Sequence, residues 1–125
     1  MSKTVLVVDD SILMRRMIAE SLMDSGWDVA GEAQDGEEAV DRYRELSPDA
    51  VTMDIVMPNA DGLYALKEIL DLDPDAKVVV VSALNQTKLI SEAIRRGAQD
   101  FIAKPFLPEQ LQQTMASCLQ EPAPT

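Results

Sequence analysis

An α/β fold built around a parallel sheet is the architecture that this sequence predicts, and the spacing of its apolar runs carries that prediction. Three runs are rich in β-branched residues and almost continuously apolar, as are strands buried on both faces of a sheet. They span Thr4–Val8, Ala50–Met53 and Lys77–Val81. Two weaker candidates lie at about residues 28–32 and 99–103. Patterns typical of helices separate the five segments, and this strict alternation predicts helices packed on the faces of a sheet.

Turn and capping residues define the ends of the predicted helices. Asp35 is followed three residues later by Glu38, a spacing typical of a capping box at a helix start. This helix is expected to continue to about Leu46 and to stop before Pro48. The other boundary residues are a glycine after the first helical pattern, a glycine after the fourth, and a proline at the start of the last helix: Gly26, Gly97 and Pro108.

Length and composition restrict the kinds of protein that this chain can be. Its 125 residues, 46% of them apolar, suffice for one domain with its own core. We expect that domain over residues 1–120 and a flexible tail over 121–125. The net charge of −11 argues against direct binding to nucleic acid or to an anionic membrane, because phosphates are bound by clustered Lys and Arg. No Walker-type loop or GxGxxG motif supports a nucleotide cofactor.

The cysteine and histidine content narrows the chemistry and the location. The single cysteine, Cys118, cannot form an intrachain disulfide, and its helical spacing from Leu111 and Met115 assigns it to the core. No apolar run reaches the length of a membrane span and the N-terminus lacks a signal-peptide pattern, so a cytoplasmic location is expected. The absence of histidine excludes a Ser-His-Asp triad and any role as a phosphohistidine donor.

Polar residues stand where each of four predicted strands ends. Asp9 and Asp10 end the first strand, and Asp54 ends the third. Ser82 ends the fourth strand and Lys104 follows the fifth. In a doubly wound sheet, ligands bind beyond the carboxyl ends of the strands, at the point where the strand order reverses. We therefore expect these five residues to form a candidate site at one edge of the sheet.

The residue types at this edge indicate phosphoryl transfer. If the first and third strands are neighbours, Asp9, Asp10 and Asp54 converge, and their mutual repulsion calls for a hard cation such as Mg²⁺. Lys104 starts roughly 14 Å away, at about 4.8 Å per strand, but its side chain is long enough to reach inward. A nucleophilic carboxylate, a divalent ion and a fixed positive group are what phosphoryl transfer requires. Asp54 is the expected nucleophile, and Ser82 is expected to donate to a phosphoryl oxygen.

The first predicted helix carries both apolar and basic residues. Met14 and Met17 lie on its apolar stripe and are assigned to the core. Arg15 and Arg16 are assigned to a solvated face. Their position near the candidate site also leaves contact with a partner open.

Four motifs occur in order along the chain: VLVVDDS at residues 5–11, MDIVMPNADG at 53–62, VVSA at 80–83 and FIAKPF at 101–106. Together they resemble the motifs of response-regulator receiver domains, especially those of the CheY-like chemotaxis type. The resemblance spans nearly the whole chain, and four motifs in order are far more specific than one. It implies a flavodoxin-like (βα)5 three-layer sandwich whose five-stranded parallel sheet has the order 2-1-3-4-5.

The resemblance also implies roles for individual residues. Asp54 would be the phosphoacceptor. Asp10 and Asp54 would bind Mg²⁺ directly, Asp9 would do so mainly through water, and the backbone carbonyl of Val56 would complete the protein ligands. Lys104 would pair with the phosphoryl group.

A cis peptide bond and a switch pair are further implications of the resemblance. The bond between Lys104 and Pro105 would be cis. Ser82 and Phe101 would form the switch, with the Ser82 hydroxyl turning toward a new phosphoryl group and Phe101 rotating into the vacated space. Because many relatives have Tyr where this chain has Phe101, output recognition is expected to be more apolar here.

The predicted function is that of a stand-alone, monomeric CheY-like receiver in a two-component system. It would accept phosphate from a histidine kinase and assist only its own phosphotransfer and dephosphorylation. It would signal to an output protein through the face formed by the fourth helix, fifth strand and fifth helix, with the flagellar motor as a candidate output. Three alternatives stay open: a receiver excised from a longer regulator, a Mg²⁺-dependent phosphatase-like enzyme acting through Asp54, and a binding module that is not phosphorylated.

Overall fold

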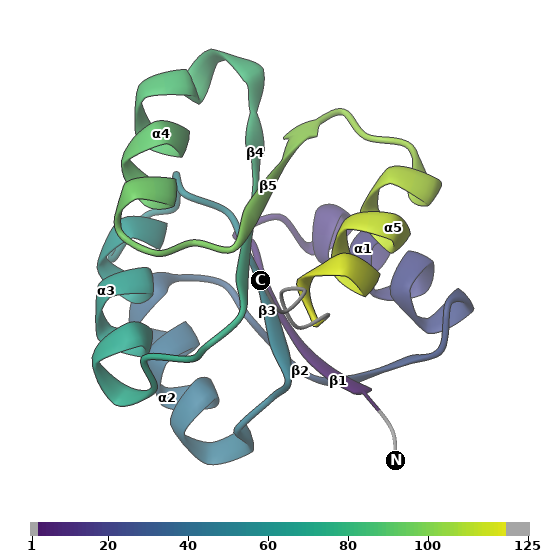
Figure 1. The fold of residues 1–125 in the computed structure, drawn as a ribbon, viewed down its shortest axis with the longest axis horizontal. Coiled ribbons are helices and arrows are strands. Elements are labelled where there is room, and N and C mark those ends of the chain that lie inside the picture. Colours follow the sequence, from purple (N-terminus) through teal and green to yellow (C-terminus); the bar gives the residue numbers. More distant parts are fainter. Residues whose placement is uncertain (1–2, 120–125) are drawn as a thin grey trace, which may run out of the picture.

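The computed structural model describes residues 3–119, which form a five-stranded parallel sheet between two layers of helices (Figure 1). The strand order is β2-β1-β3-β4-β5, and every neighbouring pair is parallel. The strands are β1 (Lys3–Val8), β2 (Trp27–Ala33), β3 (Ala50–Met53), β4 (Val78–Ala83) and β5 (Asp100–Lys104). The predicted flavodoxin-like architecture and its strand order are confirmed.

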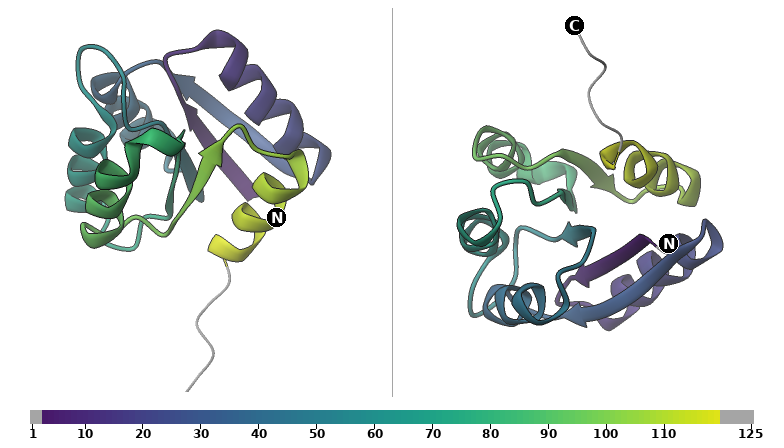
Figure 2. Two further views of the ribbon diagram at one scale, coloured as in Figure 1. Left: turned by 90° about the horizontal axis from the view of Figure 1, so that it is seen from above. Right: turned by 60° about the horizontal axis from the view of Figure 1, so that its bottom comes forward.

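Helices cover both faces of this sheet (Figure 2). On one face lie α1 (Ile12–Asp24) and α5 (Pro108–Cys118); on the other lie α2 (Gly36–Leu46), α3 (Gly62–Leu72) and α4 (Thr87–Arg95). A short 3₁₀ turn, Leu84–Gln86, precedes α4.

The sheet divides the core into two layers, because successive side chains of a strand point to opposite faces. In β1, Leu6 and Val8 pack in the layer of α2, α3 and α4. Val5 and Val7 pack in the layer of α1 and α5. All four side chains are at most 1% exposed. Burial on both faces explains why the strands are continuously apolar.

Helix ends lie at the capping and turn residues that the sequence predicts. The Asp35 carboxylate accepts a hydrogen bond of 2.9 Å from the Glu38 amide, and α2 begins at the residue after Asp35. Ser47, in the left-handed conformation with φ 43°, closes α2 before Pro48. Two glycines are also left-handed, and a proline begins α5: Gly26 (φ 95°), Gly97 (φ 116°) and Pro108.

Strands β4 and β5 differ from their predicted ranges. β4 continues to Ala83, so Ser82 lies inside the strand instead of ending it. β5 includes Lys104 as its last residue instead of stopping before it. The ladder continues through the pairs Ser82–Ala103 and Ala83–Lys104. Backbone hydrogen bonds hold these pairs whatever the polarity of the side chains, which is why the apolar runs underestimate the strands.

The layer formed with α1 and α5 contains the single cysteine and the single tryptophan. Cys118 is 2% exposed and packs in the same cluster as Leu111 and Met115, which confirms its assignment to the core. Burial raises the pKa of its thiol to about 11. Trp27 begins β2 and is also 2% exposed, with the Lys3 ammonium 4.8 Å from its ring centre.

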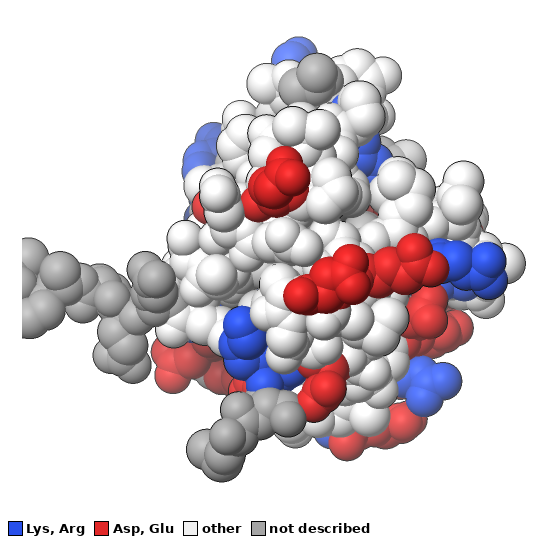
Figure 3. All heavy atoms as spheres, turned by 90° about the vertical axis from the view of Figure 1, so that its right-hand side faces the viewer, with Lys and Arg blue, Asp and Glu red and all other residues white. Residues whose placement is uncertain are grey.

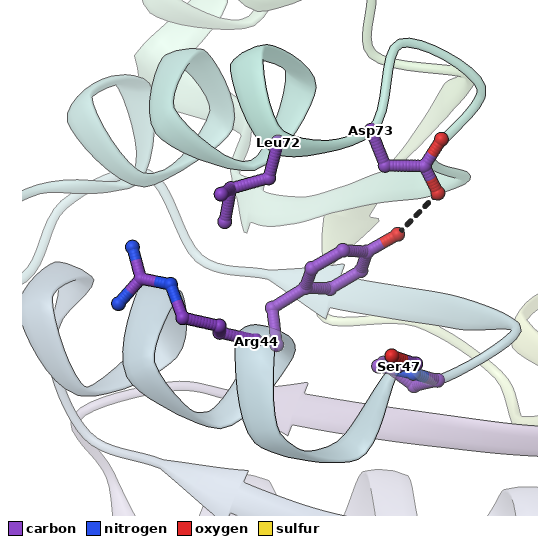
Figure 4. A pocket seen from close by; sticks show the side chains of 6 residues that line it. Arg44, Ser47, Leu72 and Asp73 are labelled. Carbon is purple, nitrogen blue, oxygen red and sulfur yellow. Dashed lines mark hydrogen bonds between the residues drawn. The ribbon is translucent and has the colours of Figure 1, made fainter.

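The C-terminal ends of α2 and α3 are joined by a hydrogen bond of 3.0 Å from the Tyr43 hydroxyl to the Asp73 carboxylate (Figure 4). Burial raises the pKa of Tyr43 far above its usual range, so the phenol remains a donor at neutral pH. These side chains line a cavity of about 270 Å³ with Arg44, Ser47 and Leu72. Because α2 and α3 begin at the edge of the sheet where β1 and β3 end, this cavity lies toward the opposite edge.

Membrane insertion and the tail are the remaining predictions about organisation. Among residues 3–119, the helices are all too short or too polar to cross a bilayer. The predicted tail over residues 121–125 lies outside the described residues, as does the predicted domain boundary at residue 120.

Candidate functional site: an acidic cluster beside a lysine

Three carboxylates meet at one edge of the sheet. Asp9 and Asp10 follow β1 and Asp54 follows β3, and these strands are neighbours, with Val8 paired to Met53. One oxygen from each carboxylate lies within 4.8 Å of the other two. Asp9 and Asp54 are 1% and 7% exposed, whereas Asp10 is exposed. The predicted convergence of the three residues is confirmed.

Lys104 reaches this cluster from β5, at the end of the sheet. Its ammonium donates to the Asp9 carboxylate at 2.7 Å and to the Asp54 carboxylate at 3.4 Å. The lysine side chain is 19% exposed, so water screens both ion pairs only partly. The peptide bond from Lys104 to Pro105 is cis, as the motif resemblance implies.

Backbone groups hold Asp9 in place. Its carboxylate accepts a hydrogen bond of 2.9 Å from the Ser11 amide, and its own amide donates to the Ala33 carbonyl at 3.0 Å. The Ser11 hydroxyl in turn caps α1 by accepting from the Met14 amide at 3.2 Å. The turn from β1 into α1 is thereby fixed, with the Asp9 side chain directed into the site.

The pKa of Asp54 is raised above its ordinary value of 3.8. Burial is the largest cause, and the negative charge of Asp9 adds to it; the Lys104 charge and a hydrogen bond of 3.4 Å from the Val56 amide act in the opposite direction. By formal charge, the three carboxylates outnumber the single Lys104 ammonium at the site. Clustered carboxylate oxygens of this kind suit a hard divalent cation.

The loop from β3 into α3 approaches Asp54 closely at Gly62. The Gly62 amide donates to the Ile55 carbonyl at 2.8 Å. A Cβ atom at Gly62 would lie 2.7 Å from the Ile55 Cα and would overlap the Asp54 carbonyl oxygen. The Asp61 carboxylate caps α3 by accepting from the Tyr64 amide at 2.9 Å. The first position of α3, beside the site, thus requires a residue without a side chain.

The remaining predicted site residues differ in burial and in location. Ser82 is buried in β4, 1% exposed, on the strand next to β3. Val56 is 50% exposed in the loop after β3. Phe101 is 44% exposed near the start of β5 and lines a groove with Ile90 and Ile94 of α4, away from the acidic cluster. The roles assigned to these three residues stay predictions.

Arg15 lies beside the site, and the solvated face that the sequence predicts for it is wrong. Its side chain is only 13% exposed. The guanidinium donates to the Asp9 backbone carbonyl at 2.6 Å and to the Glu32 carboxylate at 2.9 Å. Neither contact has a signal in sequence spacing, because both depend on how α1 packs beside β2.

A family model described as the response regulator receiver domain matches residues 5–116. That segment contains every residue of the acidic cluster and Lys104. The chain belongs to the response-regulator receiver family. It is a CheY-like receiver domain of a two-component response regulator.

Individual relatives support the same assignment for this receiver domain. The chemotaxis protein CheY of Thermotoga maritima is 51% identical over 111 residues, covering 89% of this chain and 92% of the relative. The protein-glutamate methylesterase/protein-glutamine glutaminase of the same organism is 50% identical over 105 residues, covering 81% of this chain but 30% of the relative. The crystal structure of the CheX–CheY–BeF₃–Mg²⁺ complex from Borrelia burgdorferi aligns with a TM-score of 0.90 at 34% identity, covering 95% of this chain and 90% of that one.

The close approach at Gly62 predicts that Gly62→Ala destabilises the receiver domain by about 1–3 kcal/mol, because backbone atoms cannot yield to the added methyl group. Urea unfolding followed by circular dichroism measures this loss. Gly31→Ala is the control, since its Cβ would meet only the end of the Leu46 side chain, at 2.8 Å, and should cost less. Equal stability of the Gly62→Ala variant and the native protein would contradict the prediction.

The raised pKa of Asp54 predicts that Asp54→Asn is more stable than the native receiver domain at pH 7 in EDTA. Because the folded-state pKa lies above the unfolded value, ionisation of Asp54 opposes folding as pH rises, and the stability difference should narrow as pH falls toward 3.8. Urea midpoints across this range measure it. Asp28→Asn, an exposed position on β2, removes the same charge and should show a smaller gain. A lower midpoint for Asp54→Asn at pH 7 would refute the argument.

Proposed function

We propose that this receiver is a phosphorylation-activated switch that accepts a phosphoryl group on Asp54. The observation that carries the proposal is the setting of this carboxylate: buried at the end of β3, within 4.8 Å of two other carboxylates and 3.4 Å from the Lys104 ammonium. A buried carboxylate among like charges is costly for a structural role. Beside a cation site and a lysine, the same carboxylate has the partners that phosphoryl transfer uses.

In the proposed transfer, an Asp54 oxygen attacks the phosphorus in line. The bond from phosphorus to the donor nitrogen breaks, and the departing imidazole takes up a proton. Lys104 already lies between Asp9 and Asp54, so it can exchange one carboxylate oxygen for a phosphoryl oxygen with little movement. Mg²⁺ is the proposed cofactor, held directly by Asp10 and Asp54, mainly through water by Asp9, and by the Val56 carbonyl. It would offset the charge of the phosphoryl oxygens.

A histidine kinase is the proposed donor. The chain contains no histidine, so a phosphohistidine must come from another protein. Large apolar side chains lie in the first turn of α1 and in the connection from β5 to α5, at the same edge as the acidic cluster: Ile12, Leu13 and Leu107 are 68%, 67% and 62% exposed. An apolar rim around a charged site suits the docking of a protein better than that of a small phosphorylated molecule.

Ser82 and Phe101 form the proposed switch pair. A phosphoryl group on Asp54 would replace the single negative charge of the carboxylate with about two, and would place strong acceptor oxygens next to β4. The buried Ser82 hydroxyl would turn toward it, and Phe101 on the adjacent strand β5 would move from its half-exposed position into the vacated space. The groove beside Phe101 would change shape as a result.

The proposed output surface is formed by α4, β5 and α5. A groove of about 390 Å³ lies there between Phe101 and α4, and its apolar members include Ile90 and Ile94, the latter 40% exposed. Apolar lining suits a protein partner more than a polar ligand. The similarity to chemotaxis CheY proteins, one of them crystallised with CheX, makes chemotaxis the favoured pathway and the flagellar motor a candidate output.

Charge and size complete the proposal. Because its net charge is −11, the chain is proposed to bind neither nucleic acid nor a membrane directly. We also propose that its receiver domain spans residues 1–120 and acts as a monomer in the cytoplasm. On the face drawn in Figure 3, acidic side chains occur in several groups and Lys and Arg side chains form no continuous field. We further propose that the domain is not an enzyme beyond its own phosphotransfer and dephosphorylation.

A second arrangement has support from one comparison. The related segment of the Thermotoga methylesterase makes up 30% of that protein, so a receiver of this kind also occurs within a longer chain. A receiver with a separate output domain is therefore the alternative to a stand-alone CheY-like protein. The full gene sequence decides between the two.

Treatment with acetyl phosphate and Mg²⁺, followed by intact-protein mass spectrometry, tests the proposal. The native protein should gain a single phosphoryl group that hydroxylamine removes, because acyl phosphates react with this nucleophile. Asp54→Asn should gain none, and EDTA should prevent the reaction. Asp28→Asn, which loses an exposed carboxylate on β2, should be modified like the native protein.

Other results of this experiment would favour the alternatives. An unmodified native protein would contradict the proposal and favour a binding module. An adduct that persists in Asp54→Asn would move the acceptor to another residue. Repeated release of phosphate from a small phosphoester, lost in Asp54→Asn, would favour a phosphatase-like enzyme.

The proposed switch predicts that phosphorylation alters amide hydrogen exchange in residues 87–104, while the region around Tyr43, at the far ends of α2 and α3, stays unchanged. Ser82→Ala should still be phosphorylated but should show a smaller exchange difference in α4 and β5, because it lacks the hydroxyl that responds to the phosphoryl group. Mass spectrometry of peptides after hydrogen exchange measures both. An identical response of Ser82→Ala and native protein would argue against Ser82 as the link.

A further inference from the structure

Arg15 connects the acidic edge of the sheet to β2. Its Nη1 donates to the backbone carbonyl oxygen of Asp9 at 2.6 Å, and its Nε donates to the Glu32 carboxylate at 2.9 Å. The side chain is 13% exposed although it belongs to the first turn of a surface helix, and its partner Glu32 is 50% exposed. The guanidinium is therefore committed to these two contacts.

The carbonyl that Arg15 binds belongs to the peptide group between Asp9 and Asp10. Because a peptide group is planar, a hydrogen bond to its oxygen restrains the orientation of the whole plane, and with it the position of the Asp10 Cα atom from which the next side chain leaves the backbone. The Asp9 carboxylate has its own donors, the Ser11 amide and Lys104. By contrast, no group within residues 3–119 donates a hydrogen bond to the exposed Asp10 carboxylate, so its backbone alone directs it.

We propose that Arg15 is a positioning residue of the cation site, orienting the Asp10 carboxylate toward Asp9 and Asp54 through the Asp9–Asp10 peptide group. The inference rests on the proposed Mg²⁺ site. In it, Arg15 supports Mg²⁺ binding but does not contact the ion itself. A guanidinium is suited to the task because its rigid fork serves the carbonyl and Glu32 at once, whereas a lysine has a single nitrogen. The hydrogen bond to the carbonyl is charge-assisted and correspondingly strong.

Isothermal titration calorimetry of the full chain with MgCl₂, without a phosphoryl donor, tests the role of Arg15. Arg15→Gln should weaken Mg²⁺ binding by about 10-fold, the lower end of the effect of removing a residue that orients a metal ligand. Arg16→Gln is the matched control, since it removes the same charge from the adjacent, exposed residue of α1. Arg16→Gln should bind Mg²⁺ like the native protein. A difference in Mg²⁺ affinity between the two variants would therefore reflect the contacts of Arg15 and not the loss of one positive charge.

Two more measurements separate positioning from general stability. Arg15→Lys should recover part of the Mg²⁺ affinity, because its ammonium can still reach the Asp9 carbonyl. The backbone amide signal of Asp10 in NMR spectra should shift in Arg15→Gln and not in Arg16→Gln. A residue that only stabilised α1 would change the unfolding midpoint without changing the Mg²⁺ affinity.

Equal Mg²⁺ affinity of Arg15→Gln and Arg16→Gln would overturn the inference and leave Arg15 as a tie between α1 and β2. If Arg15→Gln does not fold, Arg15→Met is compared with Arg16→Met, since methionine keeps an apolar stem but cannot donate to the Asp9 carbonyl, and equal affinities overturn the inference in the same way. A native protein that binds no Mg²⁺ would instead refute the proposed metal site, and the inference with it. The two failures are therefore distinguishable.

Discussion

Repulsion among three carboxylates is the interaction on which the rest of the site depends. Asp9 and Asp54 are buried, so water screens their charges poorly, yet rigid strand ends hold them together with Asp10. The Lys104 ammonium, reaching in from β5, supplies one positive charge against the three carboxylates, and burial keeps the pKa of Asp54 raised despite it. The fold thus holds three carboxylates together despite their mutual repulsion, and a bound cation would reduce that repulsion.

Much of this arrangement could be predicted because a parallel sheet brings all strand ends to one edge. Asp9, Asp54 and Lys104 each stand where an apolar run stops, and the motif resemblance supplied the strand order that places them together. The predicted ends of the strands were less accurate than the predicted convergence of these residues. The apolar runs stop at Val81 in β4, whereas the backbone ladder includes the polar Ser82.

The residues that could not be predicted are those whose environment depends on packing between elements. Arg15 looked solvated, but the placement of α1 beside β2 buries it against the Asp9 backbone. Met17 was assigned to the core and is 47% exposed, because the sheet and α5 cover a narrower stripe of α1 than its apolar residues occupy. Met14 packs against the core as predicted. A default assignment of Phe101 to the interior would likewise miss its half-exposed position on β5.

The location of Trp27 has a practical consequence for spectroscopy. It is paired with Lys3 at the start of β1, and the six residue steps from Lys3 to Asp9 correspond to about 20 Å along the strand. As the single tryptophan of the chain, it is the dominant intrinsic fluorophore. Its emission reports whether the layer of α1 and α5 is folded. A ligand bound at the carboxylates is expected to leave the Trp27 emission unchanged.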